Sequence, residues 1–428
     1  MSNLAYDTEL PGGASAEEVA QLNALRPVPR ISIHAFCETE SVFKPIERAR
    51  EDRRLVKAHL RVVMGGLESA IEYYGTTPTP NLIILESRAE PKELLQSLET
   101  LAEVCDPSTK VIVIGHVNDV ILYRELMREG ISEYLVAPLH QLQVIDVIGN
   151  LFRDPKANPV GKVQAFVGAK GGVGSSMIAH HVGWIMSRHF AIDTVITDLD
   201  LAFGTAGLNF NLDTPQGIVE ALGASDRIDQ VLIDRLLTKC GERLSLLASS
   251  GSVERDVSVD SQALQTILDA VRSRVPLVVV DLPNVWTPWS KLTLTQADEV
   301  IVTATPELAS LRNAKNLIDF LKAARPNDRP PHLVLNQVGV VKRPEIPVGD
   351  FARAIGVEPT VVVPYDCKSF GTASSNGQMI FDVAPKSKAA EALISLAQQL
   401  SGMQPPAAKS GKFSLAPLMK SLPGLRKK

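Results

Sequence analysis

The segment VQAFVGAKGGVGSSMIAHHVG, residues 163–183, sets the architecture of the chain. It opens with an apolar run, 163–167, which predicts a buried strand. It continues through a glycine-dense turn, 168–174, and takes on the apolar spacing of a helix from Ser175 onward. Backbone N–H groups of such a turn point inward, and the helix N-terminus adds partial positive charge. The order of strand, glycine turn and helix therefore predicts a phosphate cradle.

The glycine turn departs from the common phosphate-binding loop, G-x-x-x-x-G-K-[ST]. Ala169 takes the first glycine position, and Ser175 stands where the phosphate-binding lysine belongs. Ser176 keeps the hydroxyl that would bind Mg²⁺, and a lysine occurs earlier, at Lys170. The glycine spacing does not satisfy the dinucleotide-binding pattern G-x-G-x-x-G. A tight strand–helix junction without a ligand is the structural alternative.

A lysine directly before Gly-Gly-Val-Gly resembles the deviant P-loop of the MinD/ParA family of ATPases. The resemblance implies that Lys170 reaches across a dimer to the partner's nucleotide. It makes ATP and Mg²⁺ the expected cofactors. The missing lysine at Ser175 leaves nucleotide binding expected but makes ATP hydrolysis slow or absent. The residues expected to hold the nucleotide here are Ala169, Lys170, Gly171, Gly172, Val173, Gly174, Ser175 and Ser176.

Acidic residues follow two apolar strands of the same region. Asp198 and Asp200 lie at the C-terminal end of the strand predicted at 194–197, and Asp281 directly follows the apolar run 277–280. Carboxyl ends of parallel strands share one edge of a sheet, where ligands bind. Asp281 has the position of the acid that holds Mg²⁺ through water. The family resemblance implies a Mg²⁺-linked role for Asp198 and a water-orienting role for Asp200. The alternative, that these carboxylates only cap turns, stays open.

The residues expected around the base lie further along the chain. Asn336 ends the apolar run 332–336, and in the family an asparagine here reads the adenine. A side-chain amide both donates to and accepts from the adenine edge. The loop after the strand 361–366 is expected to close over the base, with Pro364 and Tyr365 lining it.

Residues 31–150 alternate strand and helix patterns five times, which predicts a small doubly wound parallel sheet. This half resembles a response-regulator receiver domain, through PNLIILE at 80–86 and YLVAP at 134–138. Glu86 replaces the phospho-acceptor Asp, Gly115 the switch Ser/Thr, and Ala137 the lysine. We therefore interpret it as a docking or dimerisation module that is not phosphorylated.

Composition limits the classes of function. The 428 residues are 45% apolar and 21% charged, with net charge −4, so no broad basic footprint for nucleic acid is expected. Four scattered cysteines indicate reduced thiols, and no signal pattern or membrane-length apolar run occurs, which predicts a cytoplasmic protein. The expected organisation is α/β throughout: a disordered leader 1–30, a receiver-like domain 31–152, a linker 153–161, a MinD/ParA-like P-loop domain 162–401 and a basic flexible tail 402–428.

The basic tail alternates lysine and arginine with apolar side chains. Such a tail either contacts a membrane surface or a partner, or remains a disordered solubilising tail, since Pro417 and Pro423 would break a long helix. His181 shares the apolar face of the helix after the glycine turn and is expected to be packed rather than catalytic.

The pairing of a receiver-like half with a KGGVGSS loop resembles the CpaE/TadZ family of tight-adherence (Flp, type IVb) pilus-assembly proteins. The resemblance implies a homodimer that acts with pilus-secretion proteins at a cell pole, as a nucleotide-stabilised scaffold. An active ParA-like DNA-partitioning ATPase and a scaffold with an empty nucleotide site are the alternatives.

Overall fold

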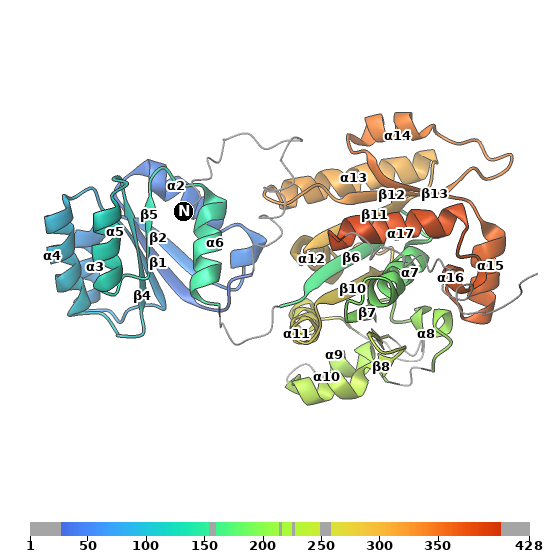
Figure 1. Ribbon diagram of the computed structural model, residues 1–428, viewed down its shortest axis with the longest axis horizontal. Helices are drawn as coiled ribbons and strands as arrows, with labels where there is room; N and C mark the ends of the chain where they lie inside the picture. Colours follow the sequence, from blue (N-terminus) through green and yellow to red (C-terminus); the bar gives the residue numbers. More distant parts are fainter. Residues whose placement is uncertain (1–26, 154–159, 214–215, 225–226, 249–257, 404–428) are drawn as a thin grey trace, which may run out of the picture.

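The computed structural model describes residues 27–153, 160–213, 216–224, 227–248 and 258–403 (Figure 1). They form two units, each a sheet between layers of helices, which confirms the predicted α/β class with parallel sheets. The predicted leader, linker and tail lie almost wholly outside the described residues. Within the described residues, no helix combines the length and hydropathy needed to cross a membrane.

The first unit has five parallel strands in the order β2-β1-β3-β4-β5, the order of flavodoxin-like doubly wound sheets. Helices α2 and α6 cover one face, and α3, α4 and α5 cover the other (Figure 1). The strands are β1 (Ser32–Cys37), β2 (His59–Met64), β3 (Leu82–Glu86), β4 (Lys110–Gly115) and β5 (Glu133–Val136). The helices are α2 (Glu40–Ala49), α3 (Gly66–Tyr74), α4 (Pro91–Ala102), α5 (Val120–Arg128) and α6 (Gln141–Leu151), with a short 3₁₀ turn η1 (Arg53–Leu55).

Glu86 ends β3 at the position where a receiver carries its phospho-acceptor. Its Oε2 accepts the backbone N–H groups of Glu38 (2.7 Å) and Thr39 (2.9 Å), and its Oε1 contacts the Thr39 hydroxyl (2.6 Å) and His116 Nε2 (2.9 Å). Burial alone would raise the pKa of Glu86, but these hydrogen bonds outweigh burial and lower it. Both oxygens of the Glu86 carboxylate are therefore hydrogen-bonded within the first unit.

Gly115 ends the neighbouring strand β4, and its lack of a side chain makes room for Tyr134. A Cβ at position 115 would lie 2.1 Å from the Tyr134 hydroxyl, which donates to the Val117 carbonyl at 2.8 Å. We expect Gly115→Ala to displace the tyrosine ring and lower the free energy of unfolding by about 1–3 kcal/mol. Urea denaturation measures the change. Gly75→Ala, whose Cβ would meet nothing closer than 3.4 Å, is the control. Equal stability of the two variants would show that Tyr134 relocates freely.

The second unit has eight strands in the order β13-β12-β11-β6-β10-β7-β9-β8, and only β8 runs antiparallel to its neighbour. Helices α9 to α14 pack on one face, and α7, α8, α16 and α17 on the other, with α15 beside α16. The strands are β6 (Lys162–Gly168), β7 (Thr194–Asp198), β8 (Thr238–Lys239), β9 (Leu244–Leu247), β10 (Leu277–Leu282), β11 (Glu299–Ala304), β12 (His332–Val338) and β13 (Pro359–Pro364). The helices are α7 (Ser175–Arg188), α8 (Ala206–Asn209), α9 (Ile218–Gly223), α10 (Gln230–Leu236), α11 (Ser261–Arg272), α12 (Pro288–Gln296), α13 (Leu308–Ala324), α14 (Val348–Ile355), α15 (Cys367–Asn376), α16 (Ile380–Val383) and α17 (Lys388–Ser401).

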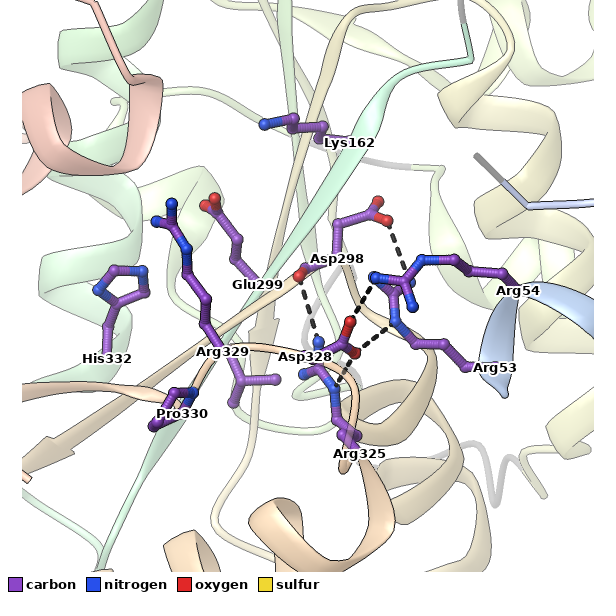
Figure 2. A pocket seen from close by; sticks show the side chains of 11 residues that line it. Arg53, Arg54, Lys162, Asp298, Glu299, Arg325, Asp328, Arg329, Pro330 and His332 are labelled. Atoms are coloured by element: carbon purple, nitrogen blue, oxygen red, sulfur yellow. Dashed lines mark hydrogen bonds and ion pairs between the residues drawn. The ribbon is translucent and has the colours of Figure 1, made fainter. Parts of the chain in front are cut away.

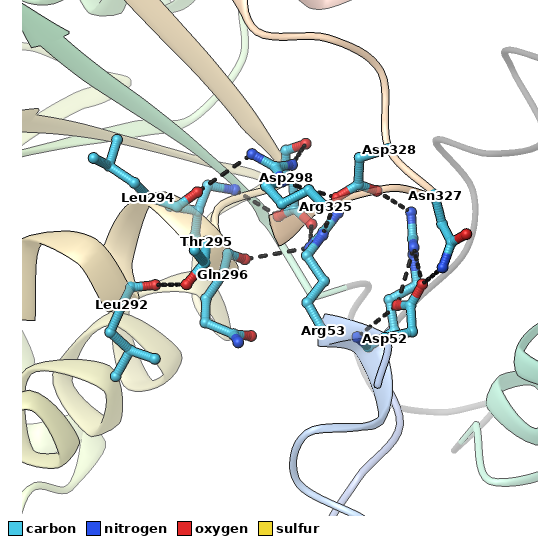
Figure 3. A network of polar contacts seen from close by, with 12 residues as sticks. Asp52, Arg53, Leu292, Leu294, Thr295, Gln296, Asp298, Arg325, Asn327 and Asp328 are labelled. Atoms are coloured by element: carbon cyan, nitrogen blue, oxygen red, sulfur yellow. Dashed lines mark hydrogen bonds and ion pairs between the residues drawn. The ribbon is translucent and has the colours of Figure 1, made fainter. Parts of the chain in front are cut away.

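A network of charged side chains joins the two units (Figure 3). Asp328 accepts hydrogen bonds from Arg53 Nε (2.7 Å), Arg54 Nη2 (2.6 Å) and Arg325 Nε (2.9 Å). Asp298 accepts from Arg53 Nη1 (3.1 Å) and Arg272 Nη2 (2.9 Å). We call Asp52, Arg53, Arg54, Arg272, Asp298, Arg325 and Asp328 the interdomain network.

The interdomain network lies at the amino ends of β6 and β11. Asp298 directly precedes β11, and its Oδ2 accepts the backbone N–H of Val163 in β6 at 2.8 Å. A cavity of about 30 Å³ lies beside it, lined also by Glu299, Arg329 and His332, which Figure 2 labels. That volume is enough to hold a water molecule. The contact between the units is therefore built from charged side chains.

Candidate functional site

The glycine turn between β6 and α7 forms an open run of backbone donors. Gly174 is the N-cap of α7 and offers no side chain to cap it. The N–H groups of residues 170–177 donate to no acceptor among the described residues. Gly172 and Gly174 have φ of 79° and 86°, a conformation that favours glycine. The predicted phosphate cradle is thus present as a nest of unpaired N–H groups at a helix N-terminus.

Four side-chain amides bind the carbonyl oxygens of the same turn. Asn284 Nδ2 donates to the Gly168 oxygen (2.6 Å) and Asn313 Nδ2 to the Ala169 oxygen (3.0 Å). Gln337 Nε2 donates to the Gly172 oxygen (3.0 Å) and Asn336 Nδ2 to the Val173 oxygen (2.8 Å). These hydrogen bonds occupy the carbonyl groups of the turn. The N–H groups of the turn are left for a ligand in the cradle.

Ala169 differs from the other loop residues in its backbone hydrogen bonds. Its N–H donates to the Thr303 carbonyl (2.8 Å), its own carbonyl is taken by Asn313, and its side chain is buried. Both of its backbone polar groups thus make hydrogen bonds that close the turn against β11. The expected contact of Ala169 with the nucleotide stays a prediction.

The predicted acids meet because β7 and β10 are neighbours in register, with Asp198 opposite Asp281. Burial, followed by the charge of Asp281, raises the pKa of Asp198 to about 6. Asp281 Oδ1 is buried without a hydrogen-bond partner, and so is the Ser175 hydroxyl, while Ser176 follows Ser175 in the first turn of α7. Mg²⁺ prefers carboxylate, hydroxyl and phosphate oxygens. Asp281 and Ser176 are therefore the residues that would hold a Mg²⁺ ion beside the cradle, where it would neutralise phosphate charge.

Asp198 and Asp200 also cap the loop that follows β7. Asp198 accepts the N–H groups of Asp200 (3.0 Å) and Ala206 (3.1 Å), and Asp200 Oδ1 accepts that of Phe203 (3.0 Å). The turn-capping alternative is thus part of the structure. Asp200 stands at the same sheet edge as the cradle, but no contact here gives it a catalytic role.

The residues expected around the base line one cavity. Asn336, Pro364 and Tyr365 surround a space of about 380 Å³ next to Gly174, with Phe370 on its far wall. Asn336 uses one amide proton on Val173, so its Oδ1 and second proton remain for a ligand. The sequence thus identified three residues that the fold brings together beside the cradle.

Lys170 forms an ion pair within its own chain. Its Nζ lies 3.1 Å from Glu307 Oε2, and Glu307 Oε1 contacts Arg343 at 3.5 Å. The hydrogen bond from Lys170 lowers the pKa of Glu307. To reach a partner's nucleotide, Lys170 would have to leave Glu307.

Sequence reasoning missed the partners of the acids and of the turn. His180 lies on α7, buried, 3.4 Å from Asp281 Oδ2, and the spacing of four residues from Ser176 could have placed it there. Burial alone would lower its pKa, but the hydrogen bond with Asp281 and the acidic charges raise it. His181 is packed, as expected: its nitrogens contact the Met177 carbonyl (2.7 Å) and the Ile380 N–H (2.9 Å).

Comparisons with known proteins agree with this geometry. No family model matches the chain. A solved pilus assembly protein CpaE from Caulobacter crescentus is 50% identical, with a TM-score of 0.30, and the match covers 98% of that chain and 30% of this one. A ParA family ATPase from Chlorobium tepidum is 25% identical, with a TM-score of 0.51, over 99% of that chain and 56% of this one.

The septum site-determining protein MinD of Synechocystis is 26% identical over 157 residues, which are 36% of this chain and 57% of that protein. The chain thus spans little more than half the length of this curated relative. The 50% identity to nearly the whole solved CpaE chain carries the assignment, and the ParA match agrees with the P-loop sheet. The chain belongs to the CpaE family, with a MinD/ParA-like P-loop fold in its second unit.

Proposed function

We propose that the protein binds ATP and Mg²⁺, pairs with a second copy of itself through the nucleotide edge, and serves as a scaffold in pilus assembly. The single observation that carries the pairing is a ring of exposed apolar side chains at the carboxyl edge of the second sheet. Their exposed fractions run from 43% to 82%, and they follow five different strands. They are Phe203 and Leu208 after β7, Val285 and Trp286 after β10, Leu308 after β11, Val341 after β12 and Tyr365 after β13.

Such a ring around a polar site is typical of a surface that meets another protein. Lys170 lies within it and is about one third exposed. In the proposed dimer, Lys170 exchanges Glu307 for the partner's phosphates. The backbone donors of 170–177 hold the phosphates, Ser176 and Asp281 hold Mg²⁺, and Asn336 contacts the base.

Hydrolysis is expected to be slow or absent. Ser175 contributes a hydroxyl where the common loop has a charged phosphate contact, and its Oγ is buried without a partner. A charge-assisted hydrogen bond to phosphate is about twice as strong as a neutral one. The role in pilus assembly is supported by the name of the Caulobacter relative, which is a pilus assembly protein. Cytoplasmic placement at a cell pole, and membrane contact through residues 402–428, are parts of the same proposal.

The test is light scattering of the full chain with and without ATP–Mg²⁺. We expect a nucleotide-dependent dimer, and Lys170→Ala to weaken it at least about tenfold, which is 1.4 kcal/mol, because each protomer loses a cross-interface charge. Lys315→Ala, which removes an exposed lysine paired with Asp319 on α13, is the matched control. Phosphate release is measured on the same samples. A dimer indifferent to nucleotide, or rapid hydrolysis, would contradict the proposal.

A further inference from the structure

Three side chains of metal-ligating types lie together behind the P-loop: His180 from α7, Asp198 from β7 and Asp281 from β10. Their ligand atoms all lie within 4.8 Å of one another, and His180 Nε2 is 3.4 Å from Asp281 Oδ2. Donors that share one ion at 2.0–2.2 Å stand about 3 to 4.4 Å apart. A movement of a few tenths of an ångström would therefore bring all three onto one cation.

The cluster also contains a polar atom without a hydrogen bond. Asp281 Oδ1 is buried and has no partner, and the contact of His180 Nε2 with Asp281 Oδ2 is long, at 3.4 Å. Buried polar atoms in folded proteins are nearly always satisfied. An unpartnered carboxylate oxygen beside a weakly bonded imidazole indicates a place for a ligand.

Neighbouring groups hold the three side chains in position. Asn209 Nδ2 lies 2.8 Å from His180 Nδ1, the nitrogen that faces away from the acids. For Nε2 to bind a metal, Nδ1 must carry the ring proton, so the Asn209 amide would turn its oxygen toward Nδ1. Asp198 is held by the N–H groups of Asp200 and Ala206. Such outer contacts orient the ligands of metal sites. In this arrangement Nε2 of His180 is the nitrogen directed at Asp281.

We propose that His180, Asp198 and Asp281 directly bind one transition-metal dication, of which Mn²⁺ is the representative, in the absence of nucleotide. The inference rests on the proposed function in that the two acids also belong to the proposed Mg²⁺–ATP site. It differs in its ligands, because an imidazole nitrogen suits transition-metal dications such as Zn²⁺ or Ni²⁺, whereas Mg²⁺ is bound through oxygen. A metal held this way stays with the chain when the nucleotide leaves.

The experiment uses the full chain, stripped of metal with a chelator and free of nucleotide, titrated with Mn²⁺ and followed by electron paramagnetic resonance. We expect one bound Mn²⁺ per chain, with a nitrogen hyperfine coupling from the imidazole. His180→Asn should lose the coupling and weaken Mn²⁺ binding at least about tenfold. His189→Asn, an exposed histidine at the end of the same helix, should change neither.

Two outcomes overturn the inference: Mn²⁺ that binds only with nucleotide, or bound Mn²⁺ without nitrogen coupling in the unmodified chain. The second needs no variant, so a folding defect of His180→Asn would not hide it. Calorimetry of ADP binding in excess chelator tests the nucleotide site separately. Mn²⁺ bound without any ADP affinity would contradict the proposed function and leave the metal site standing.

Discussion

Asp328→Asn is expected to lower the free energy of unfolding by about 3–5 kcal/mol, the cost of removing one charged partner from a buried network of ion pairs. Asp328 accepts hydrogen bonds from three arginines, two of them in the first unit and one in the second. All of these side chains are at most 11% exposed, so water cannot replace the lost carboxylate. The substitution removes the charge and keeps the shape.

Urea denaturation at neutral pH measures this effect. Asp319→Asn breaks an ion pair on the surface of α13, where both side chains are about half exposed, and should cost less than about 1 kcal/mol. If the two substitutions cost the same, the interdomain network would contribute no more than a surface pair.

The same variant predicts a dependence on pH. Burial would raise the pKa of Asp328, but Arg53, Arg325 and Arg54 outweigh it and lower the pKa to about 2. The unfolded value is near 3.9. The stabilisation is therefore complete above about pH 5 and is lost as pH falls toward 2, by about 2 kcal/mol. The difference in stability between the unmodified chain and Asp328→Asn should shrink over this interval and stay constant above it.

Gly174→Ala is expected to weaken ADP binding about 100-fold or more, which is 2.7 kcal/mol. Position 174 has φ of 86°, where a side chain is strained, and the added Cβ would lie 2.7 Å from Asn336 Nδ2. Asn336 would have to release the Val173 carbonyl and move toward the base cavity. One methyl group would thus disturb the turn and the base contact together.

Calorimetry of ADP binding checks this prediction. Gly349→Ala adds the same methyl group in α14, where it meets nothing within 4 Å, and should leave the affinity unchanged. Thermal melting shows whether the Gly174 variant remains folded. Full ADP affinity in a folded Gly174→Ala protein would mean that Asn336 is not fixed by the turn.

The fold and the centre of the site could be predicted because their signals are local. The run of apolar residues, the glycine turn and the helix lie within 163–183, and the strand-end acids follow from the same periodicity. Helix α2 gives only a weak signal in the sequence, because residues 40–49 include four charged side chains and Pro45. Its buried face consists of only Val42, Ile46 and Ala49.

The contacts that could not be predicted join residues far apart in the chain. Asn313 looks like any polar residue of an amphipathic helix, yet it binds a carbonyl 144 positions away. Arg53 lies in a polar stretch of the sequence, and its partner Asp328 is 275 positions away. A single sequence contains no periodicity that reports such pairs, because only the folded chain brings them together.

The place of the interdomain network has a consequence for the proposed dimer. It lies at the amino end of β6, and the nucleotide cradle at the carboxyl end, so the seven residues of this strand separate them by about 23 Å. Two chains that meet at their nucleotide edges would carry their first units at the outer ends of an elongated rod. The pair would then be bivalent, because its two identical first units would face away from each other. A target with repeated sites would bind the pair with avidity. ATP would then control the number of first units in one assembly rather than the affinity of each first unit for the target.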